Sequence, residues 1–96
     1  MNTEIKAIRF SLHDDAKEYL NKKLDRLKNA ENMIVDLLVT LKKEKDFVAE
    51  AKVNFRWGVS VHVSEADFEL TKSIDKMIDK LEAKITKEKE KVKEKR

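Results

Sequence analysis

The 96-residue sequence has no cysteine, no proline and only one glycine, Gly58. The absence of cysteine excludes a disulfide, a thiolate metal site and a thiol nucleophile. A single glycine excludes a glycine-rich loop that could hold a phosphate. The sequence also lacks a long apolar run of the kind that spans a membrane, and its N-terminus lacks the apolar core of a secretory signal. We therefore expect a cytoplasmic protein with no membrane partner.

Charge is abundant and nearly balanced along the chain. Charged residues make up 43% of the sequence and hydrophobic residues 41%, yet the formal net charge is only +3. This length and composition predict one domain, residues 1–96, with a single hydrophobic core. A net charge this small does not by itself indicate a nucleic-acid partner, so the distribution of the charges has to decide that question.

The C-terminal third, residues 70–96, carries the clearest charge pattern. Apolar residues recur there at steps of three and four and predict one stripe of an amphipathic helix, formed by Ile74, Met77, Ile78, Leu81, Ile85 and Val92. Lysines follow one another at steps of four on one flank of this helix, and acidic residues gather on the other. Because like charges at this spacing cost about 0.2–0.5 kcal/mol per pair, the segregation favours a surface for a polyanion. A merely solvated helix face is the alternative.

The earlier part of the chain alternates between strand and helix patterns. Period-two alternation predicts strands at residues 3–10, 33–45, 48–57 and 59–64, with Val35, Leu37, Val39 and Leu41 facing the core. Gly58 suits a tight reversal between the last two strands because glycine tolerates positive φ. An amphipathic pattern at residues 14–29 predicts a helix, and residues 29–32 and 65–69 are expected to be loops.

These elements predict an α+β fold in the order β-α-β-β-β-α. The apolar stripes make it a two-layer sandwich, with two helices packed on one face of a four-stranded sheet and the last three strands as an antiparallel meander. We expect a weak capping box of Ser11 and Asp14 at the start of the first helix. The basic side of that helix, with Lys22, Lys23 and Arg26, lies beside the basic flank of the last helix if the two pack with those flanks adjacent.

A search for catalytic chemistry finds no convincing constellation. His13 and His62 have no partner at metal-binding spacing, and Asp75 and Asp79 fit solvated charges on a helix face. We therefore expect a protein that is not an enzyme and has no cofactor, metal or small-molecule substrate. Trp57 is expected to pack in the core or at a sheet edge. Recognition of structured RNA by its shape and backbone is then favoured over stacking on single strands.

Four stretches together carry a family resemblance: LHDDAKEYLNKKLDRL at residues 12–27, VTLKKEK at 39–45, Gly58, and SIDKMIDK at 73–80. In order, spacing and length the chain resembles the short form of the ribosome hibernation-promoting factors, also called ribosome-associated translation inhibitors. The sequence departs from the family pattern at three positions. His13 replaces the usual capping threonine, Val59 the second turn glycine, and Thr71 an aromatic residue.

The resemblance implies a stress-response factor that binds the small ribosomal subunit and its ribosomal RNA. It would block the channel for messenger and transfer RNA and so inhibit translation, and it would be a monomer off the ribosome. It implies a chain without the C-terminal domain that pairs ribosomes, and we expect residues 92–96 to form a frayed tail. Its effect on ribosome pairing, promotion or prevention, stays open.

The expected RNA-binding residues come from two sources. Those that match basic positions of the family are Lys23, Arg26, Lys80, Lys87 and Lys89, and helix geometry adds Lys22, Lys76 and Lys84. Two other functions remain open at this point. One is a protein-interaction module in which the C-terminal helix forms a coiled coil or docks on an acidic partner, and the other is a generic binder of structured RNA.

Overall fold

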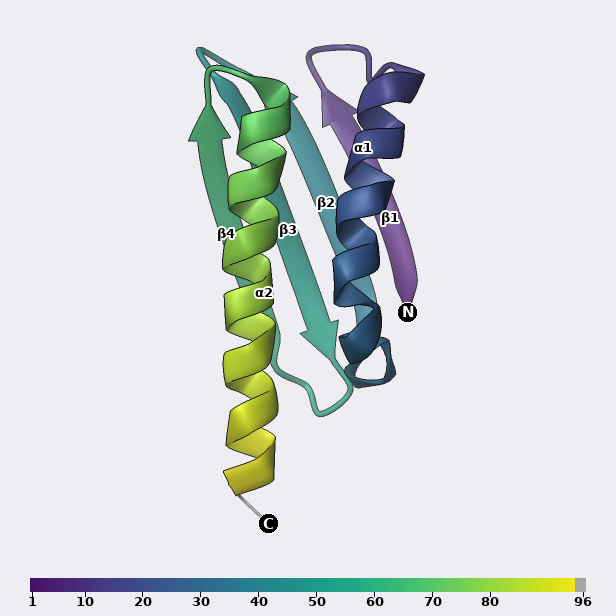
Figure 1. The fold of residues 1–96 in the computed structure, drawn as a ribbon, viewed down its shortest axis with the longest axis vertical. Helices are drawn as coiled ribbons and strands as arrows, with labels where there is room; N and C mark the ends of the chain where they lie inside the picture. The colour runs from purple at the N-terminus through teal and green to yellow at the C-terminus, as the bar shows by residue number, and fades with distance from the viewer. Residues whose placement is uncertain (95–96) are drawn as a thin grey trace.

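The computed structural model describes residues 1–94, which form one sheet with both helices on the same face (Figure 1). The elements follow the order β1 (Asn2–Ile8), α1 (Asp14–Leu24), a 3-10 helix η1 (Asp25–Met33), β2 (Ile34–Lys43), β3 (Phe47–Phe55), β4 (Ser60–Asp67) and α2 (Leu70–Glu94). The predicted α+β class and two-layer architecture are confirmed. The expected tail, residues 92–96, is helical as far as Glu94, and residues 95–96 lie outside the described residues.

The sheet has the strand order β1-β2-β3-β4. β1 is parallel to β2, and the other two pairs are antiparallel, which confirms the predicted meander. A parallel pair needs a crossover connection, and α1 with η1 supplies it. One row of paired residues, Ile5, Val39, Ala51 and Val63, crosses all four strands on the face that the helices cover. The opposite face carries polar neighbours such as Lys52 and His62 and is left open.

A bulge changes the pattern at the start of β2. The pairing with β3 shifts between Ile34 and Asp36, so Val35 has no partner of its own. The extra residue moves the alternation by one position, and Ile34 is buried at 1% exposure while Val35 is 43% exposed. The prediction that Val35 faces the core is therefore wrong. The later members of the pattern, from Leu37 to Leu41, face the core as predicted.

The first helix is shorter than predicted. α1 ends at Leu24 and continues as the 3-10 helix, so residues 29–32 are not a polar loop. Leu24, Leu27 and Ala30 are buried and follow each other at steps of three. Side chains three residues apart eclipse each other in a 3-10 helix, so the tighter winding keeps all three on the core side.

The helix starts and turns show two further differences. The N-cap of α1 is His13, which makes no side-chain cap hydrogen bond, so the capping box of Ser11 and Asp14 is wrong. β4 continues to Asp67, which shortens the expected loop at residues 65–69. Gly58 adopts a φ of +84°, as a reversal at this position requires.

The two helices divide the sheet between them. α1 lies over β1 and β2, whereas α2 lies over β3 and β4 and runs along most of the length of the domain (Figure 1). The apolar stripe of α2 is buried from Ile74 to Ile85, as predicted. Two polar residues in that helix, Ser73 and Glu88, are buried as well. Within residues 1–94, no helix is long and apolar enough to cross a membrane.

Candidate nucleic-acid interface

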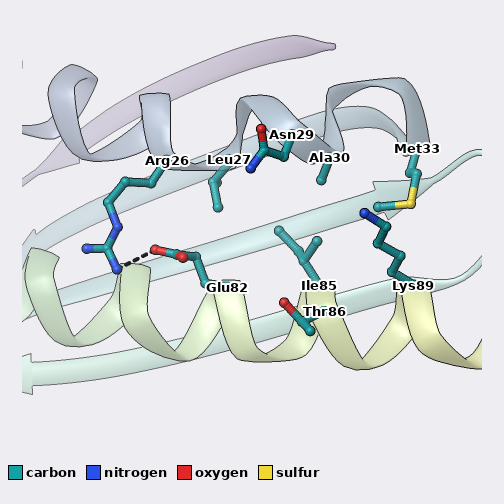
Figure 2. Close-up of a pocket in the computed structure, with 9 residues that line it drawn as sticks. All are labelled: Arg26, Leu27, Asn29, Ala30, Met33, Glu82, Ile85, Thr86 and Lys89. Carbon is teal, nitrogen blue, oxygen red and sulfur yellow. Dashed lines mark ion pairs between the residues drawn. The ribbon is translucent and has the colours of Figure 1, made fainter.

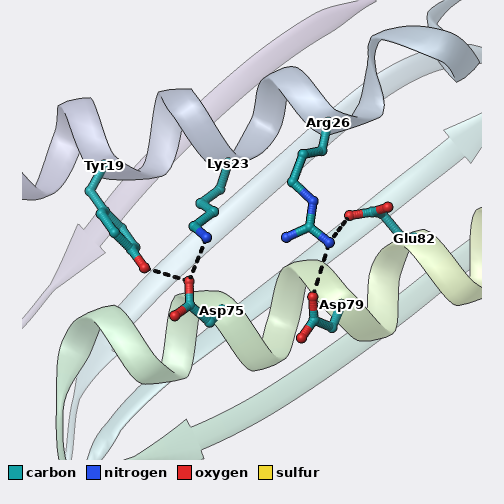
Figure 3. Close-up of polar contacts among 6 residues, drawn as sticks. All are labelled: Tyr19, Lys23, Arg26, Asp75, Asp79 and Glu82. Atoms are coloured by element: carbon teal, nitrogen blue, oxygen red, sulfur yellow. Dashed lines mark hydrogen bonds and ion pairs between the residues drawn. The ribbon is translucent and has the colours of Figure 1, made fainter.

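The acidic flank of α2 faces α1. The Tyr19 hydroxyl donates a hydrogen bond to Oδ1 of Asp75 at 2.6 Å, and Nζ of Lys23 lies 3.3 Å from the same oxygen (Figure 3). The hydrogen bond to Asp75, helped by partial burial and by the carboxylate charge, raises the pKa of Tyr19 above its ordinary value. Asp75 therefore ties two α1 side chains to α2.

Arg26 makes the second tie between the helices. Its Nη2 lies 3.1 Å from Oδ1 of Asp79 and 2.5 Å from Oε1 of Glu82 (Figure 3). Oε1 of Glu82 is buried and has no partner with hydrogen-bond geometry among the described residues, so its compensation is the adjacent guanidinium charge. We call the contacts of Tyr19, Lys23 and Arg26 with α2 the interhelical seam.

This seam contradicts the expected adjacency of the two basic flanks. The cations of α1 face the acidic flank of α2 because opposite charges attract across the short gap between the helices. The basic flank of α2 points instead toward β4, at the edge of the sheet. The predicted site residues therefore do not form one continuous surface between the helices.

Two lysines of the basic flank contact β4. Nζ of Lys76 lies 2.8 Å from Oδ2 of Asp67, and Nζ of Lys80 lies 3.4 Å from Oε2 of Glu65. The pKa of Asp67 is lowered, first because the backbone N–H of Glu69 donates a hydrogen bond to it and second because Lys76 does. The same carboxylate raises the pKa of Lys76. The fold thus offsets part of the charge at this end of the flank.

The next lysines along this flank keep their charge exposed. Lys84 and Lys87 line a hollow of about 230 Å³ together with Val59, Ser60 and Lys91. Among the side chains that the structure describes, neither Lys84 nor Lys87 has an ion-pair partner within 4.0 Å. We call Lys76, Lys80, Lys84 and Lys87 the outer row. It covers 11 residue steps of helix, which is roughly 16 Å.

Two predicted residues lie apart from the outer row. Lys89 projects from the other side of α2 into a groove of about 190 Å³ beside η1, where it points toward Met33 and Arg26 also lines the wall (Figure 2). Lys22 is exposed on α1, and no ion pair to it is found in the described part of the chain. The eight predicted residues therefore lie in three places. Lys23, Arg26 and Lys89 lie at or beside the seam, the four lysines of the outer row lie along α2, and Lys22 lies alone on the exposed side of α1.

One functional candidate was missed in the sequence. Nε1 of Trp57 donates a hydrogen bond to Oε1 of Glu88 at 3.0 Å, and the indole stacks on Phe55 with ring centroids 5.2 Å apart. Trp57 lies beyond the end of β3 and is 39% exposed. The sequence did contain a signal for this contact. Glu88 lies three residues after Ile85, so it takes a position of the apolar stripe, where a buried carboxylate needs a hydrogen-bond donor.

The histidines are not gathered with other ligands. His13 and His62 are both exposed, and no group of three or more metal-ligating side chains occurs within residues 1–94. The outer row of α2 and the neighbouring Trp57 together offer a cationic and aromatic surface. Such a surface suits contacts with phosphates and with planar apolar groups.

The strand order and the placement of the helices define the structural class of this protein. It is a two-layer β-α-β-β-β-α domain with both helices on one face of the sheet. A family model described as "Sigma 54 modulation protein / S30EA ribosomal protein" matches residues 3–93, so the chain belongs to this family. The resemblance to ribosome hibernation-promoting factors is thereby confirmed, and the family is one of ribosome-associated proteins.

Solved structures agree with this assignment. The crystal structure of the Thermus thermophilus Protein Y N-terminal domain is 28% identical, with a TM-score of 0.79, and the match covers 91% of this chain and 98% of that one. A ribosomal subunit interface protein from Coxiella burnetii is 20% identical, with a TM-score of 0.84 over 93% of this chain and 98% of that one, and shares the fold. No curated protein matches the chain.

Proposed function

We propose that this protein binds the small ribosomal subunit through ribosomal RNA and blocks the channel for messenger and transfer RNA. It would act in the cytoplasm under stress, as a monomer when off the ribosome, and its role would be binding without catalysis. The observation that carries the proposal is the outer row on α2, because its lysines present a line of positive charge in a family of ribosome-associated proteins.

The distribution of charge supports this choice of surface. On the open face of the sheet, cations and anions are interspersed, and Lys42 lies 3.0 Å from Glu50. Within the described residues, the outer row of α2 has anionic partners only at its Lys76 and Lys80 end. A polyanion would therefore meet uncompensated charge at Lys84 and Lys87, where it displaces no internal ion pair.

Rigidity supports a mechanism of steric occlusion. The seam ties α1 to α2, and the apolar stripe of α2 anchors it on the sheet, so the lysine row is held on a rigid frame before binding. A preorganised surface loses less entropy when it binds. Burial of Ile74, Met77 and Leu81 also argues against a coiled coil through α2, because the stripe that such a dimer needs is already covered.

Cosedimentation with purified small subunits over a series of salt concentrations tests the proposal. Each phosphate contact adds about 0.7–0.9 to the slope of log affinity against log salt. Replacing Lys84→Gln and Lys87→Gln together should lower the slope by about 1.4–1.8. The matched control, Lys6→Gln with Lys52→Gln, removes the same charge from the open sheet face and should leave the slope unchanged.

Two results would count against the proposal. Retention that ignores salt, or equal slopes for the two double variants, would exclude phosphate contacts by the outer row. A messenger or transfer RNA bound at undiminished level beside the protein would exclude occlusion of the channel. Competition by plain RNA duplex at the same concentration as small subunits would favour the generic binder of structured RNA.

A further inference from the structure

A second hollow lies beside the outer row, at the end of the sheet. It has a volume of about 410 Å³ and is lined by Trp57, Val59, Glu88, Lys91 and Val92. It shares Val59, Glu88 and Lys91 with the smaller hollow that Lys84 and Lys87 line. One continuous depression therefore combines an aromatic ring, apolar walls and a rim of lysines.

The ring of Trp57 is held in place from two directions. Phe55 stacks beneath it with an interplanar angle of 14°, and the indole N–H is fixed by its hydrogen bond to Glu88. Glu88 is itself only 9% exposed, so this is a partly buried polar contact that sets the orientation of the ring. Apart from its two chain neighbours, no described residue has an atom within 4 Å of the position that a Cβ would take at Gly58. A fixed aromatic platform loses little conformational entropy when a ligand stacks on it.

The rim is cationic in spite of Glu88. Oε1 of that carboxylate already accepts the indole hydrogen bond. Lys84, Lys87 and Lys91 are exposed, and in the described part of the chain no carboxylate lies within ion-pair distance of them. The depression therefore offers a flat apolar surface and three positive charges within about two turns of helix.

We propose that Trp57 and the lysines around it form a subsite for one unpaired nucleotide of RNA. The base would stack on the exposed part of the indole, beside Val59, and the flanking phosphates would lie against Lys84, Lys87 and Lys91. A nucleotide within an RNA strand is a planar base flanked by two phosphates. The base matches the apolar surface of the depression, and the phosphates match its rim of lysines. The inference rests on the proposed function and adds to it a contact that reads a flipped-out base rather than backbone shape.

The single tryptophan makes the test direct. Trp57 is the only tryptophan of the chain, so its fluorescence reports on this position alone. Titration with a short single-stranded RNA should quench the emission, because the base stacks on the indole. The same RNA with an abasic site in place of each base keeps the phosphates and should bind without quenching. Equal quenching by the intact and the abasic RNA, or by an acidic peptide of the same charge, would overturn the subsite.

A variant tests the subsite on the ribosome. Trp57→Leu with Glu88→Leu removes both partners of the buried hydrogen bond, so neither is left unsatisfied. Its affinity for small subunits should fall about 5- to 150-fold, the usual effect of losing one stacked base, with an unchanged salt slope. Unchanged affinity would overturn the subsite and leave the proposed function standing. Failure of the unmodified protein to sediment with small subunits would instead overturn the proposed function.

Discussion

Removal of the Arg26 side-chain charge tests the role of the interhelical seam in stability. The change Arg26→Met keeps much of the aliphatic stem and leaves two carboxylates without their cation. Asp79 is 68% exposed on its side chain, so its pair with Arg26 should contribute no more than about 1 kcal/mol. Glu82 is 35% exposed, but its Oε1 is buried next to the guanidinium, and an unpaired buried polar atom costs about 1–3 kcal/mol.

The expected total is therefore about 1–4 kcal/mol, most of it from Glu82. For a domain of this size each kcal/mol corresponds to a shift in Tm of about 4–8 °C. Urea and thermal unfolding of a double-mutant cycle would separate the two pairs. The second change Glu82→Leu should recover most of the loss caused by Arg26→Met, because it removes the buried oxygen, and Asp79→Asn should recover little.

The matched control is Lys22→Met, which removes a charge from the exposed side of α1. It should change the free energy of unfolding by less than about 0.5 kcal/mol. If Arg26→Met unfolds with the same Tm as the control, the Arg26 contacts of the seam do not stabilise the domain. A larger coupling of Arg26 with Asp79 than with Glu82 would refute the reasoning from burial.

Three further predictions concern the pH dependence, the turn and the core. Folding lowers the pKa of Asp67, so its contribution is present above the unfolded pKa and is lost as the pH falls through the folded value. Asp67→Asn should therefore flatten acid unfolding below about pH 4. Lys76 has a raised pKa, so its contribution is present at neutral pH and is lost only in alkali, as the pH rises through the folded value. Gly58→Ala should cost about 1–2 kcal/mol in urea unfolding in spite of the open space, because φ is +84°. Leu81→Ala should cost about 2–5 kcal/mol by the same assay, because Leu81 is fully buried.

Much of the fold follows from periodicity in the sequence. Alternation from Leu37 to Leu41 and the stripe from Ile74 to Ile85 are each repeated often enough to fix the inward face of an element. The bulge at Val35 could not be predicted, because it depends on how β2 pairs with β3. The 3-10 winding after Leu24 could not be predicted either, since one stripe of leucines fits an α-helix almost as well.

The arrangement of the candidate site was harder to predict. The sequence predicts which side chains share a face of α2, and the outer row follows from that spacing. It does not predict which flank faces α1, because that depends on how two helices far apart in sequence pack. Lys23 and Arg26 were predicted to bind RNA, and the structure places both in ion pairs within the seam. Their assignment to RNA stays a prediction, as do those of the other six residues.

The central claim is that the outer row of α2 faces ribosomal RNA. The chain contains no cysteine, so a single cysteine can carry a tethered hydroxyl-radical source at a chosen position. Ala83→Cys places the source on the exposed side of α2 near the outer row, and Ser64→Cys places it on the open face of the sheet. In complexes with small subunits, we predict strong local cleavage of the ribosomal RNA from position 83 and little from position 64. Stronger cleavage from position 64 would contradict the account, because the sheet and not the outer row would then face the RNA.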